Sequence, residues 1–311
     1  MKIYHFTHTD LDGVSCAALA QLYARMTGDE IETHYVDYDN VEKEINDYLD
    51  NGNKVSAALL ITDLSISDEL AEKIDKTVNS YGNTLKVRLM DHHKTSEHMN
   101  YPWCRIVVNG IDSATSIAAR CFFDEAVTAI MSFADAVAEY DTYRFDKTKL
   151  GLPQQLNHFC YMVDHDTFIK YVIDTITDHP YASFQLFDET ILKFIKYKEE
   201  QAHEYTDRKT DEAKIIEANG HKIACVYAEN NISLVGNTIA TKYGTNIDYV
   251  AVIEMGKSVH LRGLDHSPDL SEIAKQHGGG GHQKAAAYPI TEIDPIILLG
   301  DEKNETVQTD E

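Results

Sequence analysis

The chain has 311 residues, enough for two modest domains, and 43% of them are hydrophobic, which suits a protein with a buried core. Its formal net charge of −23 argues against a protein that coats long nucleic acid, because such binding draws on basic surfaces. The sequence shows neither a signal-peptide pattern nor an apolar run of the roughly 18–20 residues that cross a bilayer, and its five cysteines form no C-x-x-C pair, so we expect a cytoplasmic protein without membrane contacts.

Strands and helices alternate through the first part of the chain. Strand patterns lie near 2–7, 31–36, 57–62, 85–90 and 104–108, and helical patterns lie near 13–26, 41–50, 67–80, 113–123 and 125–140. This alternation predicts an α/β fold in which helices cover both faces of a parallel sheet. In such sheets ligands bind beyond the carboxyl ends of the strands.

The second half predicts a helical linker and a smaller α/β domain. Residues 151–219 look helical, and 184–218 predict one long connecting helix that ends before Gly220. Strands are expected near 222–227, 248–254, 257–263 and 284–288, with helices near 233–243 and 269–276. We therefore divide the chain into a first domain at 1–183, a connecting helix at 184–220, a second domain at 221–298 and an acidic, disordered tail at 299–311.

Polar residues stand where the first, third and fourth predicted strands end. They are His8, Asp10, Asp12, Asp63, Asp91, His92 and His93. Alternate residues of an extended segment point the same way, so the H-x-D-x-D side chains can converge on one site. Carboxylate and imidazole groups together suit manganese, and a buried carboxylate without a partner would be costly. The pattern predicts a metal site, against the alternatives that Asp12 caps a helix and Asp63 is a turn residue.

Groups able to bind phosphate occur at four further places. They are Lys94, the DSATS segment with Ser113, Thr115 and Ser116, Arg262, and the run Gly278–Gly281, which His277 and His282 flank. Consecutive glycine amides can form an anion-binding nest, although a glycine run alone is typical of a flexible loop. Lys94 and Arg262 are also readily explained as surface residues, and the DSATS segment as a helix cap.

Together these segments resemble the DHH phosphoesterase superfamily. The matching pieces are HTDLDG at 8–13, TDLS at 62–65, DHH at 91–93 and a further Asp beyond a helix. In the second half, GGGGHQKAAAY at 278–288 resembles the DHH-associated nucleotide-binding domain. The nearest likeness is to the oligoribonuclease-like (nanoRNase) and cyclic-nucleotide phosphodiesterase-like members. The resemblance implies a parallel-sheet catalytic domain and a smaller α/β domain that binds substrate.

The resemblance also implies two metal ions, usually manganese, with magnesium or cobalt as alternatives. Its ligands would be Asp10, Asp12, Asp63, His92 and a fourth carboxylate, with Asp63 between the ions and with His8 and Asp91 as further candidates. For the fourth carboxylate we favour Asp141, which fits the family's D-T-x-x-F pattern, over Asp135, which lies inside an apolar helix. His93 would face the substrate phosphate or the leaving group.

On the substrate side, the resemblance assigns phosphate or the terminal nucleotide to Arg262, His282 and the glycine run Gly279, Gly280 and Gly281. We expect a manganese-dependent phosphodiesterase or exonuclease that hydrolyses short oligoribonucleotides by two-metal-ion catalysis. The alternatives are a phosphatase on a small nucleotide, such as adenosine 3′,5′-bisphosphate or a cyclic-dinucleotide product, and a non-catalytic nucleotide-binding module. The expected partners are short oligoribonucleotides or small nucleotides, and a homodimer stays open.

Overall fold

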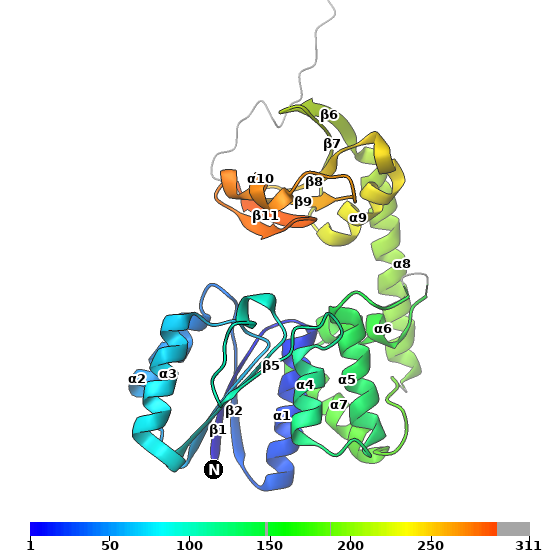
Figure 1. Ribbon diagram of the computed structural model, residues 1–311. Coiled ribbons are helices and arrows are strands. Elements are labelled where there is room, and N and C mark those ends of the chain that lie inside the picture. The colour runs from blue at the N-terminus through cyan, green and yellow to red at the C-terminus, as the bar shows by residue number, and fades with distance from the viewer. Residues whose placement is uncertain (147–148, 187, 291–311) are drawn as a thin grey trace, which may run out of the picture. The chain divides into compact units, whose positions relative to one another are not determined.

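The computed structural model describes residues 1–146, 149–186 and 188–290, with His282 described in its backbone alone (Figure 1). The predicted tail at 299–311 lies outside these residues. The chain divides into two compact units, Met1–Lys196 and Tyr197–Glu311. No helix of the described ranges is both long and apolar enough to cross a membrane, and the five cysteines are free thiols.

The first unit is built on a five-stranded, all-parallel sheet, which confirms the predicted α/β class. Its strand order is β2-β1-β3-β4-β5, from β1 (Lys2–Thr7), β2 (Glu30–Tyr35), β3 (Ala57–Thr62), β4 (Leu85–Asp91) and β5 (Cys104–Ile106). Thr7 pairs in register with Thr62, and Thr62 pairs with Met90. The central strands therefore end at one level, and the residues that follow them emerge at the same edge of the sheet.

Helices cover both faces of this sheet (Figure 1). One face carries α2 (Val41–Asn51) and α3 (Asp68–Tyr81), and the other carries α1 (Leu11–Thr27), α4 (Ala114–Phe122), α5 (Thr128–Asp141), α6 (Leu152–Met162) and α7 (His165–Asp178). Each layer has its own apolar core: Ile45, Leu70 and Ile74 are buried under α2 and α3, and Leu19 and Phe133 under the larger layer. Burial on both faces leaves the strand ends as the place for polar side chains.

The second unit contains a mixed six-stranded sheet. Helix α8 (Glu189–Glu212) runs across the division between the units, and its chain continues into β6 (Lys214–Ala218), β7 (His221–Tyr227), α9 (Ile232–Tyr243), β8 (Tyr249–Glu254), β9 (Ser258–Gly263), α10 (Leu270–Gln276), β10 (Gly280–His282) and β11 (Ala285–Pro289). The strand order is β10-β11-β9-β8-β7-β6, and β7 with β8 is its parallel pair.

One expectation for this unit was wrong, and the glycine run contains an additional short strand. The helix predicted over 184–218 ends at Glu212, and Lys214–Ala218 instead pairs antiparallel with β7. Asn219 and Gly220, with φ of 52° and 79°, form the turn between them, and Asn-Gly is the strongest short signal for such a hairpin. The glycine run is also not wholly a loop, because Gly280–His282 forms an edge strand on β11.

Candidate metal centre

Side chains from four segments meet at the carboxyl edge of the parallel sheet. They form three groups of potential metal ligands, and within each group the ligand atoms lie within 4.8 Å of one another: His8, Asp10 and Asp63; Asp63, His92 and His93; and Asp12, His92 and Asp141. Asp63 and His92 each belong to two groups. The three groups therefore form one continuous cluster.

A tight turn from β1 into α1 brings the first two of these residues together. Asp10 caps α1 by accepting a hydrogen bond from the amide of Gly13 at 3.1 Å. A Cβ on Gly13 would lie 2.2 Å from the carbonyl oxygen of His8, so this turn requires glycine. The turn leaves His8 Nδ1 3.1 Å from Asp10 Oδ2. The backbone of this turn thus explains why the H-x-D-x-D motif is followed by glycine at position 13.

Asp12 reaches across to another helix. Its carboxylate is 1% exposed and accepts hydrogen bonds from the first amides of α4, Ala114 N at 2.7 Å and Thr115 N at 2.9 Å. Negative charge at a helix N-terminus is favourable, so these bonds fix both the carboxylate and α4. Asp12 Oδ2 also lies 3.7 Å from His92 Nε2. Asp12 therefore does not cap α1, which is the role of Asp10.

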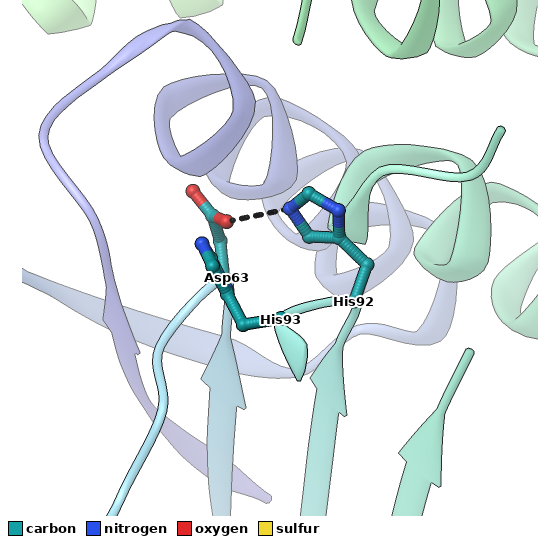
Figure 2. A group of neighbouring side chains, drawn as sticks. All are labelled: Asp63, His92 and His93. Atoms are coloured by element: carbon teal, nitrogen blue, oxygen red, sulfur yellow. Dashed lines mark ion pairs between the residues drawn. The ribbon is translucent and has the colours of Figure 1, made fainter. Parts of the chain in front are cut away.

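Asp63 belongs to two of the three groups, and Figure 2 shows its carboxylate facing the ring of His92. It is 2% exposed and adopts a left-handed backbone conformation with φ of 57°, which non-glycine residues rarely do outside turns and functional sites. Oδ1 faces His92 Nε2 at 3.5 Å, whereas Oδ2 faces His8 Nδ1 at 3.8 Å. Its two oxygens therefore face two different groups, as a bridging carboxylate requires.

Several buried atoms of the cluster make ion-pair contacts but no hydrogen bond. Within the part of the chain that the structure describes, these atoms are Asp63 Oδ2, His92 Nε2 and His8 Nδ1. Burial, followed by the charges of Asp12 and Asp10, raises the pKa of Asp63 well above its usual range and that of Asp141 to about 8. Divalent cations relieve both the missing partners and the repulsion between carboxylates. The mixed oxygen and imidazole donors thus fit the metal ions that the sequence predicted.

Hydrogen bonds occupy both oxygens of Asp91, as they do in Asp12, but the partners of Asp91 include His93. Oδ1 accepts from the amide of His92 at 2.9 Å and lies 2.7 Å from His93 Nδ1, while Oδ2 accepts from Ser96 Oγ at 2.6 Å. Asp91 belongs to none of the three groups. It orients His93, and we no longer propose it as a metal ligand.

Two further predicted residues lie away from the cluster. Asp135 is exposed on α5 and belongs to none of the groups, whereas Asp141, at the end of the same helix, lies 3.3 Å from His92. Ser116 is 2% exposed and forms a capping box with Ser113 at the start of α4. Its hydroxyl therefore caps the N-terminus of this helix. We withdraw Ser116 as a substrate contact. Lys94, directly after His93, is exposed.

In the second unit, Arg262 forms hydrogen bonds within the protein, and two of the predicted glycines pack closely against β11. Arg262 donates to Ser233 Oγ at 2.7 Å and to the carbonyl of Leu261 at 2.9 Å. A Cβ on Gly279 would lie 2.1 Å from the oxygen of Ala287, and one on Gly281 2.6 Å from that of Ala285, whereas Gly280 has open space. Close approach to β11 therefore explains two of the three glycines.

Sequence reasoning missed the loop between β2 and α2. Tyr38 Oη lies 3.0 Å from His93 Nε2, and Asp37 Oδ1 lies 3.5 Å from His8 Nε2. The signal was present, because Asp37 and Tyr38 follow the second strand, just as predicted ligands follow the first, third and fourth strands. Applying the strand-end rule to every strand would have included them.

Known proteins resemble the chain in sequence and in fold. No protein-family model matches it. It is 31% identical over 303 residues to oligoribonuclease NrnB of Bacillus subtilis (strain 168), covering 93% of this chain and 73% of that relative. Among solved structures, exonuclease RecJ bound to manganese matches with a TM-score of 0.59 and 10% identity, over 96% of this chain and 87% of RecJ.

The pGpG-specific phosphodiesterase PggH from Vibrio cholerae matches with a TM-score of 0.53 and 15% identity, over 93% of this chain and 92% of PggH. At these identities the structural matches concern the fold, and the sequence match to NrnB carries the relationship. The chain belongs to the DHH superfamily of phosphoesterases, in the family of the oligoribonuclease NrnB.

Proposed function

We propose that this protein is a manganese-dependent phosphodiesterase that hydrolyses short oligoribonucleotides with two metal ions. The observation that carries the proposal is the cluster at the carboxyl edge of the first sheet, where buried carboxylate and imidazole atoms lack hydrogen-bond partners. The kinship with an oligoribonuclease supports the substrate class.

The cluster divides naturally into two ligand sets. His8 and Asp10 would hold one ion, Asp12, His92 and Asp141 would hold the other, and Asp63 would contribute one oxygen to each. When bound, two such ions lower the pKa of a bound water and stabilise the charge that develops on the phosphate. His93 lies beside them, oriented by Asp91, and is placed to donate a hydrogen bond to the phosphate or the leaving oxygen.

Positive charge for the substrate would come from a few residues. Lys94 is exposed immediately after His93, and we propose that it binds phosphate. In the second unit, Arg262 and the backbone of Gly279–Gly281 are proposed to bind the terminal nucleotide together with His282. We also propose that residues 1–183 form the catalytic domain and residues 221–298 the substrate domain. A homodimer and a cytoplasmic location are further predictions.

Charge also limits the length of the substrate. A chain of net charge −23 offers little counter-charge for additional phosphates, and gains little from counterion release on long strands. The metals and the few cations would bind about one or two nucleotides. We therefore expect hydrolysis of dinucleotides and short oligomers to be much faster than that of long RNA.

The test is a time course with purified protein and manganese on 5′-labelled RNAs of two, five, ten and twenty-four residues, with adenosine 3′,5′-bisphosphate and a cyclic dinucleotide alongside. We expect rapid hydrolysis of the shortest RNAs and background activity after chelation by EDTA. Equal rates for two and twenty-four residues would reject the length limit. Full activity in EDTA would reject metal catalysis, and hydrolysis of the bisphosphate alone would favour the phosphatase alternative.

A further inference from the structure

Tyr38 stands beside the candidate metal centre and has no role in the metal chemistry proposed above. Its side chain is 51% exposed, yet its ring packs against that of His8, with 4.9 Å between ring centroids, and meets that of His93 edge-on at 5.9 Å. Its hydroxyl lies 3.0 Å from His93 Nε2. Tyr38 therefore contacts the inner side of the site while its other side faces solvent.

The loop that carries Tyr38 is held from both sides. The side chain of Asn40 accepts a hydrogen bond from the amide of Asp37 at 2.9 Å, and the carbonyl of Asp37 accepts one from the amide of Val41 at 3.0 Å. Thr9, in the turn that precedes α1, donates to Asp37 Oδ1 at 3.1 Å. The loop backbone is thus anchored beside His8, and rotation of the Tyr38 side chain does not require the loop to move.

The contact between His93 Nδ1 and Asp91 leaves Nε2 as the ring atom that Tyr38 can contact. Asp91 accepts the hydrogen bond at Nδ1, because a carboxylate has no proton to give. The Tyr38 hydroxyl can accept a hydrogen bond from Nε2 or donate one to it, whereas a substrate phosphate oxygen can only accept one from it. Nε2 is also the ring atom that remains for a substrate. Tyr38 and a substrate oxygen therefore compete for the same atom of His93.

We propose, resting on the function proposed above, that Tyr38 is a hydrogen-bond partner of His93 that the substrate replaces. In the free enzyme the hydroxyl holds His93 Nε2. On binding, the side chain of Tyr38 rotates towards solvent, and an oxygen of the substrate phosphate or its leaving group accepts the hydrogen bond of His93 Nε2 in its place. Each binding event breaks one hydrogen bond between Tyr38 and His93, so the Tyr38 hydroxyl weakens substrate binding. Tyr38 is therefore a specificity-determining residue. A ligand with an oxygen that bonds His93 Nε2 replaces the hydrogen bond lost from Tyr38, whereas a ligand without such an oxygen does not.

The test deletes the hydroxyl alone. Tyr38→Phe, His93→Ala, the double variant and the unchanged protein are compared for binding of a dinucleotide with a methylenephosphonate linkage, which is not hydrolysed, in the presence of manganese. Tyr81→Phe is the matched control, because Tyr81 is also an exposed tyrosine and ends α3 at the opposite edge of the sheet. Hydrolysis of an ordinary dinucleotide is measured with the same preparations.

We expect Tyr38→Phe to lower the Kd about 2–10-fold, the range of one net hydrogen bond, and to lower KM with little change in kcat. In the His93→Ala background the same substitution should leave the Kd unchanged, because the competition is gone. An unchanged or higher Kd in Tyr38→Phe, or an equal decrease with and without His93, overturns the proposal. If the unchanged protein hydrolyses no dinucleotide, the proposed function has failed; if it does and Tyr38→Phe matches it, the exchange alone has failed.

Discussion

At the carboxyl edge of the five-stranded sheet, buried polar atoms of the described residues lie close together without hydrogen bonds. The six-stranded sheet has a contrasting edge at β10, which we call the glycine edge. There Gly279 and Gly281 allow the backbone to pack closely against β11. The difference follows from strand direction. Parallel strands in register bring their carboxyl ends to one edge, so the residues after β1, β3 and β4 gather there. Antiparallel strands such as β10 and β11 alternate in direction, and their edge is shaped by close approach. Buried atoms without hydrogen bonds, more than unusual residue types, thus distinguish the edge that we propose to be functional.

Asp63→Asn should lower activity more than any other substitution considered. If it had no effect, the contrast between the two sheet edges would not reflect function. We expect kcat to fall by about 100-fold or more, since even residues that only orient metal ligands contribute about 10–100-fold. In the metal-free protein the same change should leave the thermal midpoint unchanged or higher, because burial and the charges of Asp12 and Asp10 raise the pKa of Asp63 and disfavour its charged form. Calorimetry in EDTA and kinetics in manganese measure the two effects. Substantial activity in a folded variant would contradict the bridging role.

Asp141→Asn and Asp135→Asn, two changes on one helix, should differ sharply. Asp141 lies 3.3 Å from His92, and its substitution should lower activity by about 10-fold or more. Asp135 is exposed and outside the cluster, so its substitution should change activity by less than about twofold, as is usual for surface positions. Steady-state kinetics at saturating manganese decides the matter. The reverse order would move the fourth carboxylate to Asp135.

Asp91→Asn tests whether satisfied and unsatisfied carboxylates have different roles. Loss of the bond to His93 should lower kcat by about 10–100-fold, the range for residues that orient functional side chains. Because Asp91 is outside the groups of potential ligands, the rise in thermal midpoint on adding manganese should persist. Loss of that rise, with the variant still folded, would show that Asp91 holds the metal after all.

The smallest effects are expected at the glycine edge. Gly279→Ala should destabilise the protein by about 1–3 kcal/mol, because its Cβ would meet the oxygen of Ala287 at 2.1 Å. Gly280→Ala, in open space, should change the unfolding free energy by less than about 0.5 kcal/mol. Urea unfolding measures both. If Gly280→Ala preserved stability but raised KM, the run would bind substrate as well as pack against β11.

Much of this organisation was predictable from the sequence. The alternation of apolar strands and helices predicted the parallel sheet, and the positions of His8, Asp63 and His92 after three strands predicted that they would meet. The hairpin at Asn219 and Gly220 was also readable, and the apparent helical pattern over 184–218 hid it. Periodicity and strand ends are local properties, and they determine fold class and the edge at which a site forms.

By itself, then, the sequence determined the parallel sheet and most of the residues at its carboxyl edge, because hydrophobic periodicity and strand ends can be read from consecutive residues. Only the tertiary structure decided their roles. Asp63 and Asp91 both lie at the carboxyl ends of strands and are both buried. Ser96 and His93 contact the oxygens of Asp91, whereas Asp63 Oδ2 accepts no hydrogen bond from any described residue. The physical reason is that the number of hydrogen bonds a buried carboxylate accepts depends on groups that other segments bring to it. Asp12 is the clearest case, since its partners on α4 lie about a hundred positions away.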